Sequence, residues 1–491
     1  MADLLIENVT VLTMDPTRRI IPNGYVTVTG NRIEVVGSGK PERESAKERI
    51  DGNGGVLTPG FISTHQHLID SLMRGGLEQD RNLFDWFLNV YYGGLAAYTP
   101  EDCGLAARLN VAEAIRAGVT TINDNWGVNT GDELQRVNDC AEATLEAYRE
   151  IGIRLIFARM FVDTMPPYWG PLIDNLLRKV PGKTLDSRTI AEDTDRVLTS
   201  IESLMQKHHG TENGRIHACP SPMLPQCGTP EALQGSLELA RRFDTIVPIH
   251  VCESNMDARV FSETWGGLSC TDYLNNLGFL DSRVLAAHCV WLNDRDIRLL
   301  KVNDVKVAHN PSTNMFLASG IAPIPKMIAS GITVGLGIDD TTTGSNVDML
   351  REMRHAALLH KVANLDAGAM TAEKVLEMAT IDGARAIGLE RDIGSLEPGK
   401  KADLVLFDTD RPHWYPRHHL ASTIVYQAHP DDVRTVVIDG AVVMRDRVLA
   451  WMDADEEREL CRKAQRASEA IIERAGLQVL RNRGWQSQGR W

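Results

Sequence analysis

Short apolar runs separated by helix-like stretches fill the middle of the chain. Nearly continuous apolar runs indicate strands that are buried on both faces, as in a parallel sheet. Eight strands are predicted: FISTHQH (61–67), VTTIND (119–124), IRLIFARM (153–160), IHACPS (216–221), IVPIHVCE (246–253), VLAAHCV (284–290), VKVAHN (305–310) and ITVGLGID (332–339). Eight strand-then-helix periods in about 330 residues favour a (β/α)8 barrel over an open doubly wound sheet.

The stretch between the first two runs illustrates the helical pattern. Thr99 can cap a helix, Pro100 suits its first turn, and Glu101 and Asp102 suit its positive end. Gly118 follows the expected last turn. The segment therefore predicts a helix that packs against the outside of the barrel.

The two ends of the chain alternate apolar and polar residues instead. A hairpin is expected near the start, with strands at 26–28 and 33–36 around Gly30-Asn31. Similar runs return at 402–407 and 433–444, where Asp439-Gly440 supplies a turn. Segments so far apart can share one small domain only if the part between them is a closed unit whose ends lie close together.

The expected fold class is therefore α/β, with a TIM-type barrel and a small β-sandwich domain built from both chain ends. The first part of the small domain is residues 1–58 and the barrel is residues 59–390. The second part is residues 391–491, in which an amphipathic surface helix over 454–475 closes the chain.

Composition narrows the possible partners. Lys and Arg number 52 against 66 Asp and Glu among 491 residues, so the formal net charge is −14. This charge repels phosphate backbones and anionic lipids, which argues against nucleic acid and membrane partners. The chain start lacks a basic and apolar leader, and no long uncharged apolar run occurs, so a cytoplasmic protein is expected. The eight cysteines form no C-x-x-C pair and are expected to be reduced thiols.

Ionisable residues gather at the carboxyl ends of the predicted strands, where a barrel keeps its active site. They are His65, His67, His250, Glu253, His288 and Asp339. His65 and His67 stand two positions apart on a strand, so both imidazoles can point to one face and reach one ion. With His250 and Asp339 they form a set of nitrogen and oxygen ligands suited to zinc or iron(II).

Other histidines have a simpler interpretation. A lone strand histidine such as His288 is more often a satisfied core or surface residue than a functional one. Surface positions are expected for the histidines of a proline-containing stretch, His413, His418, His419 and His429. Solvated helix or loop positions are expected for His208, His209 and His355.

Several segments together match a known family. They are PGFISTHQH (59–67), AGVTTIND (117–124), PIHVCES (248–254), AAHCVWL (286–292), HNPSTNMFLASGIAPIPKMI (309–328), GLGIDD (335–340) and GSLEPGKKADLVLFD (394–408). With these motifs the chain resembles the amidohydrolase superfamily, and within it the ATZ/TRZ group of aminohydrolases and chlorohydrolases. That group includes S-adenosylhomocysteine/5′-methylthioadenosine deaminases and s-triazine-degrading enzymes.

The resemblance implies one divalent metal, Zn²⁺ in the first place with Fe²⁺ as the alternative. Its ligands would be His65, His67, His250 and Asp339. The implied catalytic residues are Glu253, His288 and Asp339, of which Glu253 would protonate a ring nitrogen and later the leaving amine. No lysine ends the fourth strand, so the dinuclear version with a carbamylated lysine is not expected.

Substrate contacts are expected from residues near the strand ends, namely Gln66, Trp86, Trp126, Arg159, His309 and Asp340. Arg159 matches an arginine of the group, but it could equally anchor a neighbouring acidic loop. Asp340 either reads an amino or cationic group of the substrate or points away from the pocket. Aromatic side chains could line a slot for a flat ring or could be core: Phe84, Trp86, Tyr91, Tyr92, Trp126, Trp169 and Phe316.

The expected function is metal-dependent hydrolytic deamination of an amino-substituted N-heterocycle, such as a triazine, pyrimidine, purine or pterin-like ring. The glutamate and histidine with which nucleoside deaminases bind ribose and base have no obvious match at 90–102 and 218–228, which puts an adenosine-type substrate in doubt. One alternative is displacement of chloride or another leaving group from an s-triazine-like ring. Another is a catalytically silent scaffold. The resemblance also implies a homodimer or homotetramer.

Overall fold

The computed structural model describes residues 2–41, 45–75, 83–87, 91–128, 133–166, 190–344 and 346–478. It confirms each of the eight strands expected in the middle of the chain. They are β5 (Phe61–His67), β6 (Val119–Trp126), β7 (Arg154–Phe161), β8 (Ile216–Pro222), β9 (Val247–Val251), β10 (Val284–His288), β11 (Lys306–His309) and β12 (Val334–Leu336). A short strand, β13 (Asp339–Asp340), follows β12.

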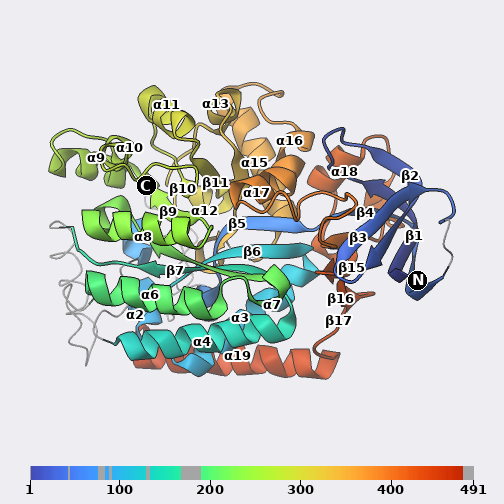
Figure 1. Cartoon of the computed structure of the whole chain (residues 1–491), viewed down its shortest axis with the longest axis horizontal. Helices are drawn as coiled ribbons and strands as arrows, with labels where there is room; N and C mark the ends of the chain where they lie inside the picture. Colours follow the sequence, from blue (N-terminus) through green and yellow to red (C-terminus); the bar gives the residue numbers. More distant parts are fainter. Residues whose placement is uncertain are drawn as a thin grey trace.

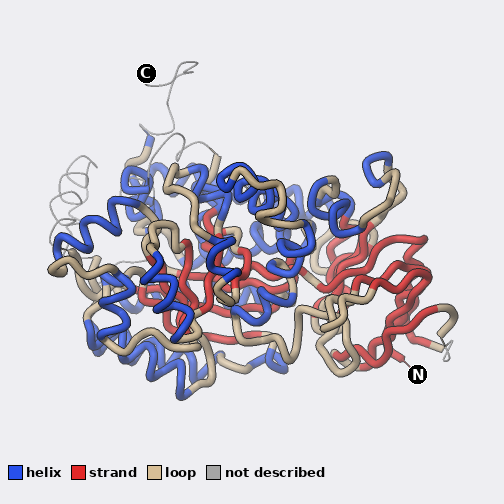
Figure 2. The backbone as a smooth tube through the Cα atoms, turned by 90° about the horizontal axis from the view of Figure 1, so that it is seen from above, coloured by secondary structure: helices blue, strands red, loops and turns tan. Residues whose placement is uncertain are grey.

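These strands run parallel in two sheets. The first has the order β13-β5-β6-β7-β8 and the second the order β12-β11-β10-β9. The sheets also meet, because β8 contacts β9 and β12 contacts β5. The two sheets therefore join at both edges and close into a ring of parallel strands, which is consistent with a (β/α)8 barrel. Helices surround these strands (Figures 1 and 2).

Helices follow the strands and cover their outer side. The longer ones are α3 (Pro100–Arg116), α4 (Leu134–Ile151), α6 (Thr194–His208), α8 (Pro230–Arg242), α9 (Asn255–Thr264), α11 (Asp294–Val302), α15 (Met349–Asn364) and α19 (Ala454–Ala475). The shorter ones are α1 (Leu83–Trp86), α2 (Tyr92–Leu95), α7 (Thr211–Gly214), α10 (Cys270–Asn276), α12 (Pro311–Phe316), α13 (Ile324–Ala329), α14 (Thr341–Gly344), α16 (Ala372–Met378), α17 (Ile381–Ala386) and α18 (Leu420–Tyr426).

The predicted cap of α3 is present as a capping box. The Thr99 side chain accepts from the Asp102 backbone N–H, and the Asp102 side chain accepts from the Thr99 backbone N–H. The closing helix α19 has the predicted bounds. It contacts α3, at the bottom of Figure 1.

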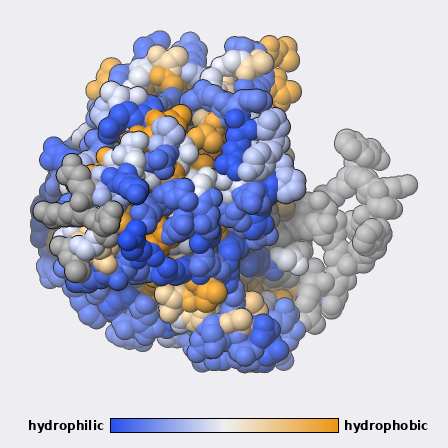
Figure 3. Space-filling view, turned by 90° about the vertical axis from the view of Figure 1, so that its right-hand side faces the viewer, coloured by the Kyte–Doolittle hydropathy of each residue, from blue (hydrophilic) through white to orange (hydrophobic). Residues whose placement is uncertain are grey.

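A third sheet combines the two ends of the chain. Its order is β17-β16-β15-β14-β4-β1-β2-β3. These strands are β1 (Ala2–Leu12), β2 (Ile20–Thr29), β3 (Arg32–Ser38), β4 (Ala46–Pro59), β14 (Leu404–Phe407), β15 (Val433–Ile438), β16 (Ala441–Arg445) and β17 (Val448–Leu449). The join lies between β4 and β14, which pair antiparallel. This sheet stands at the right of Figure 1, and polar side chains predominate on the face it turns outward (Figure 3).

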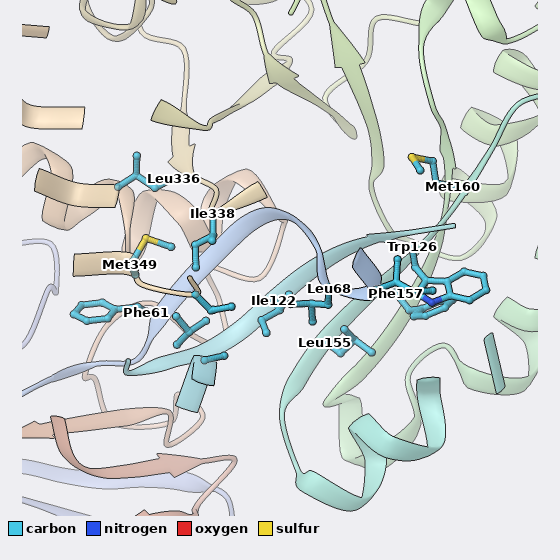
Figure 4. Close-up of a cluster of buried hydrophobic side chains, with 14 of the residues drawn as sticks. Phe61, Leu68, Ile122, Trp126, Leu155, Phe157, Met160, Leu336, Ile338 and Met349 are labelled. Carbon is cyan, nitrogen blue, oxygen red and sulfur yellow. The ribbon is translucent and has the colours of Figure 1, made fainter. Parts of the chain in front are cut away.

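Apolar side chains of β5, β6 and β7 form a continuous core. Phe61, Ile122, Leu155 and Phe157 belong to it and are fully buried (Figure 4). Because the first three barrel strands are buried along their whole length, they hold the side chains at their carboxyl ends in fixed positions.

Two further observations concern the whole chain. All eight cysteines are free, and of these only Cys461 is exposed. Within the described part, no helix has both the length and the apolar character that crossing a lipid bilayer requires.

Candidate metal and catalytic site

Three imidazoles converge at the carboxyl ends of β5 and β9. His65, His67 and His250 are buried, and their ligating nitrogens lie within 4.8 Å of one another. His67 Nε2 is 3.1 Å from His250 Nε2. The structure thus brings the His-x-His pair and His250 together, and the period-two alternation of β5 places the two histidines of the pair on one face.

Hydrogen bonds behind the imidazoles fix their orientation. His67 Nδ1 donates to the Asn125 carbonyl oxygen at 2.7 Å, and His250 Nδ1 donates to the Met223 carbonyl oxygen at 2.7 Å. With the proton on Nδ1, each Nε2 presents a lone pair to the shared space. The side-chain amide of Asn125 lies 2.9 Å from His65 Nδ1 and supports the third ring.

Asp339 brings a carboxylate to the same point. Its Oδ1 is 3.3 Å from His65 Nε2 and 3.5 Å from His67 Nε2. Asp339 has a φ of 65°, in the left-handed region that non-glycine residues rarely adopt. Such strain is found at functional sites, where the surrounding structure over-determines the backbone.

The donor set fits a divalent metal. His65 Nε2 and Asp339 Oδ2 are buried and have no hydrogen-bond partner among the described residues. Burial lowers the pKa of His67 to about 3 and that of His250 well below its usual range, so both rings are neutral, as metal ligands must be. Burial acts against ionisation of Asp339, but the neighbouring His288 and His65 lower its pKa and keep it a carboxylate.

Glu253 and His288 stand beside this set. His288 Nε2 is 3.6 Å from Glu253 Oε2 and 3.6 Å from Asp339 Oδ2, while His288 Nδ1 donates to Asn314 Oδ1 at 3.0 Å. Burial raises the pKa of Glu253 to about 7. Burial disfavours the charged form of His288, but Glu253 and Asp339 together raise its pKa. The pair can thus hold and exchange a proton near neutral pH.

The walls of the adjoining pocket are mostly apolar and aromatic. Phe87 and Tyr91 stack with ring centres 5.4 Å apart, and the ring centres of Trp86 and Tyr91 are 5.5 Å apart. The described residues of the lining include no lysine or arginine; they are His67, Leu83, Trp86, Phe87, Tyr91, Met160, Met223, Leu224, His250, Glu253, Asp257, His288, Asp339 and Asp340. This surface suits a flat ring without acidic substituents.

Asp340 lines the pocket next to Asp339 and forms a carboxyl pair with Asp70 of the 3₁₀ helix Leu68–Met73. Burial, and then repulsion from Asp70, raise the pKa of Asp340 well above its usual range. Burial likewise raises the pKa of Asp70. The proximity of the two carboxyls therefore disfavours the state in which both are ionised.

Four expected substrate contacts lie elsewhere: Gln66, Trp126, Arg159 and His309 are not in the described pocket wall. Gln66 alternates with His65 and His67 on β5, so it points away from them. Arg159 pairs with Glu192 at 2.7 Å in a buried ion pair, which is the anchoring alternative left open by the sequence. The expected substrate contacts of these residues find no support in this arrangement.

The other two residues of that group have core partners. Trp126 packs against Phe157, with ring centres 5.2 Å apart (Figure 4), and donates from Nε1 to Thr144. His309 Nε2 is 3.0 Å from His360 Nε2. Both are fully buried.

Two expectations about other side chains are corrected. Phe316 is 43% exposed, which excludes the core position left open for it, and the described pocket wall does not include it. His208, expected to be solvated, is buried and contacts Glu142 Oε1 at 3.0 Å. Trp169 and the side chains of Phe84 and Tyr92 lie outside the described residues.

Several site residues escaped sequence reasoning, notably Asp70, Asn125, Asn314 and Asp257. Asp70 had a signal, because it is the one acid within the otherwise apolar and small run that follows His67. A buried acid in such a run is costly unless it has partners. The amides carry no such signal, since their partners come from distant strands.

Comparison with known proteins agrees with this geometry. The sequence model of the amidohydrolase family matches residues 56–443. The chain is 40% identical over 483 residues to "S-triazine hydrolase" of Gordonia rubripertincta, covering 98% of each. It is 33% identical over 470 residues to "5-methylthioadenosine/S-adenosylhomocysteine deaminase" of Syntrophomonas wolfei, covering 96% of this chain and 99% of that one.

A solved structure is similar over almost the whole chain. It is the crystal structure of atrazine chlorohydrolase TrzN from Arthrobacter aurescens TC1 complexed with zinc. The TM-score is 0.84 at 25% identity, with 96% of this chain and 100% of that one covered.

Proposed function

The chain belongs to the amidohydrolase family, and we propose that it is a metal-dependent hydrolase that removes an amino group from an amino-substituted N-heterocycle. The observation that carries the proposal is the convergence of three neutral imidazoles and one carboxylate on a pocket that also holds Glu253 and His288. The deaminases and triazine hydrolase among its relatives support the same reaction class.

We infer that His65, His67, His250 and Asp339 hold one divalent metal. The zinc in the related chlorohydrolase supports zinc, and the nitrogen and oxygen donors also suit iron(II). Such an ion supplies Lewis-acid chemistry, because it makes a water molecule acidic enough to give hydroxide near neutral pH.

The protein's own groups would then move the protons. Asp339 can accept the proton of the attacking water, since it stays ionised, and His288 can hold that water through Nε2. Glu253, with its raised pKa, can carry a proton to a ring nitrogen and later to the leaving amine. Protonation of the ring nitrogen makes the neighbouring carbon more open to attack. The ring itself would lie against Trp86, Phe87 and Tyr91.

Displacement of chloride is the second candidate reaction. Its support is the structural similarity to an atrazine chlorohydrolase. The same ligands and the same attacking hydroxide serve both reactions, so the leaving group decides between them.

One screen tests both candidates. Zinc-loaded protein is incubated with melamine, 2,4-diaminopyrimidine, a pterin, adenosine and a chloro-s-triazine, and ammonia and chloride are measured. Release of ammonia supports the deaminase proposal, and release of chloride alone supports the second candidate. Absence of both products from protein that contains its metal would refute the proposal.

We also infer the domain division, with residues 59–390 as the barrel and residues 1–58 and 391–491 as the small domain. The sheet shared by both chain ends supports it, as does a separate apolar core that includes Leu4, Val26, Leu404 and Val437. The β2–β3 turn reaches the β15–β16 turn, where Asn31 Nδ2 donates to Asp439 at 3.3 Å. Such folding of the sheet onto itself supports a β-sandwich. A homodimer or homotetramer in the cytoplasm remains our expectation from the family and is testable by sedimentation.

A further inference from the structure

Asp339 and Asp340 are consecutive, yet both face the pocket. In a regular strand consecutive side chains point to opposite faces. The left-handed φ of 65° at Asp339 breaks this alternation and turns Asp340 inward. Ligand atoms of His67, Asp339 and Asp340 accordingly lie within 4.8 Å of one another, and Asp340 is only 4% exposed. Asp340 thus stands beside the reaction centre.

Asp70 lies behind Asp340, because the 3₁₀ helix that carries Asp70 contacts β13, which carries Asp340. Asp70 Oδ1 accepts from Thr341 Oγ1 at 3.0 Å, and Asp70 Oδ2 accepts from Thr342 Oγ1 at 2.9 Å and from the Thr342 backbone N–H at 3.4 Å. Trp86 Nε1 donates to the same Thr342 hydroxyl at 3.0 Å. Three donors therefore fix Asp70. One of them, the Thr342 hydroxyl, also links Asp70 to Trp86 in the aromatic wall of the pocket.

One carboxyl oxygen of Asp340 has no hydrogen-bond partner among the described residues. Asp340 Oδ1 is buried and accepts no hydrogen bond from any described residue. The described lining also offers no lysine or arginine to pair with it. Because a buried acceptor without a partner is costly, a bound ligand is the natural source of the missing N–H.

Asp340 and Glu253 lie on different sides of Asp339. Asp339 Oδ1 faces His65 and His67, while its Oδ2 faces His288, beside which Glu253 lies. Asp340 belongs to the His67 side. A ring attacked over Asp339 would meet Glu253 at one edge and Asp340 at another.

We propose that Asp340 is a specificity-determining acceptor for a second N–H group of the substrate, and that Asp70 is the residue that positions it. The favoured substrates are then amino-heterocycles that carry another amine or ring N–H besides the leaving amine. This inference rests on the proposed function for the identity of the ring.

The test compares two rings that differ only in this group. Melamine carries three exocyclic amines, and in 2-amino-4,6-dimethyl-1,3,5-triazine two of them are replaced by methyl groups. Binding of both is measured by calorimetry to the zinc-loaded full chain in a Glu253→Gln background, which keeps melamine intact. We expect a preference for melamine of about tenfold or more.

Variants separate recognition from positioning. Asp340→Asn and Asp70→Ala should each reduce the preference to about threefold or less. Asp70→Asn should keep it, because its amide still donates to Asp340 and still accepts from a threonine. Asp124→Asn is the matched control, since Asp124 is also a buried acid near the strand ends but is not in the described pocket wall, and it should keep the preference.

The outcomes are distinct from those of the product screen. Equal affinity of the two rings, or an unchanged preference in both Asp340→Asn and Asp70→Ala at equal zinc content, would overturn the inference. Failure of the wild-type protein to release ammonia from any amino-heterocycle would instead refute the proposed function, whatever the binding preference is.

Discussion

At the scale of single residues, His288 links the two halves of the proposed proton path. Its Nε2 lies 3.6 Å from both Glu253 and Asp339, and Asn314 holds its Nδ1. A ring held in this way can reorient little, so it keeps one nitrogen directed at the reacting groups. A water molecule held at that nitrogen would lie between Glu253, whose pKa is raised and which can donate a proton, and Asp339, whose pKa is lowered and which can accept one.

Replacing Glu253 with glutamine removes the proton that this residue is proposed to deliver. We expect kcat to fall about 10²–10⁴-fold, because an amide of the same shape cannot act as a general acid. Zinc content, measured by atomic absorption, should stay at the wild-type level. Normal turnover in this variant would contradict the role of Glu253.

His250→Ala should instead lose zinc and activity together. The variant removes one of the three imidazoles whose ligating nitrogens lie within 4.8 Å of one another. Zinc retained at the wild-type stoichiometry after dialysis would show that His250 is not a ligand.

The positions of the proposed metal ligands could be predicted from the sequence. The residues that hold the site's side chains in place could not. His65 and His67 follow from the alternation of a strand, and Asp339 follows from its place at the end of an apolar run. Asp70 and Asn125 reach the site only through contacts with residues far away in the chain. Whether Arg159 contacts the substrate or anchors an acidic loop depended on its pairing with Glu192, and the sequence alone does not show that these two residues are neighbours.

At the scale of elements, the turn between β12 and β13 has no space for a side chain. A Cβ at Gly337 would lie 2.3 Å from Asn310 Oδ1 and 2.8 Å from the His65 carbonyl oxygen. Any larger residue must therefore displace His65 or its neighbours.

Gly337→Ala should weaken zinc binding about 10–100-fold, the usual effect of disturbing groups behind metal ligands. Competition with a chelator measures this affinity. Gly104→Ala in α3 is the control, because its nearest neighbour would be at 3.4 Å and alanine favours the helix by up to about 1 kcal/mol. Unchanged zinc affinity in Gly337→Ala would mean that the turn tolerates the added carbon.

The packing of α15 against α12 should depend on pH through Glu352. Its carboxylate accepts from Ser312 Oγ at 2.6 Å, and burial raises its pKa from 4.5 to about 7. Between these values the folded protein holds a proton that the unfolded chain has lost. The free energy of unfolding should therefore fall as pH rises, by ~1.4 kcal/mol per pH unit for this group.

Glu352→Gln removes that dependence. Urea unfolding of both proteins from about pH 5 to about pH 8 should show the variant gaining stability relative to wild type as pH rises. A constant difference between the two curves would contradict a raised pKa of Glu352.

The sequence predicts the strands that are buried on both faces. It does not predict very short elements that form only through contacts with other parts of the chain. Strands such as β5 are buried on every residue, so their apolar runs mark them clearly. The two-residue strand β13 and the four-residue helix α14 have no such pattern, and they arise from pairing with β5 and contacts with the 3₁₀ helix that carries Asp70.

At the scale of the whole molecule, a buried ion pair links β7 to the C-terminal segment. Arg154 Nε donates to Asp403 Oδ2 at 2.7 Å, and Arg154 Nη2 donates to Asp439 Oδ1 at 3.0 Å. Removing one partner leaves a charge buried without compensation.

Arg154→Met should lower the free energy of unfolding by about 3–5 kcal/mol, and Arg154→Met combined with Asp403→Asn should recover part of this loss. Arg445→Met is the control, because its pair with Glu48 also joins the two chain ends but is exposed, and its loss should cost under about 1 kcal/mol. Equal effects of the two single variants in urea unfolding would contradict the special role of Arg154.

The pairing of β4 with β14 also sets an order for synthesis. About 340 residues separate these neighbours, so the ribosome has made all the strands of the two parallel sheets before β14 emerges. Until then β4 presents an open edge, which is a template for pairing with other nascent chains. Expression at high temperature or without chaperones should therefore yield aggregates built through the first sixty residues, even though the described pocket wall contains none of them.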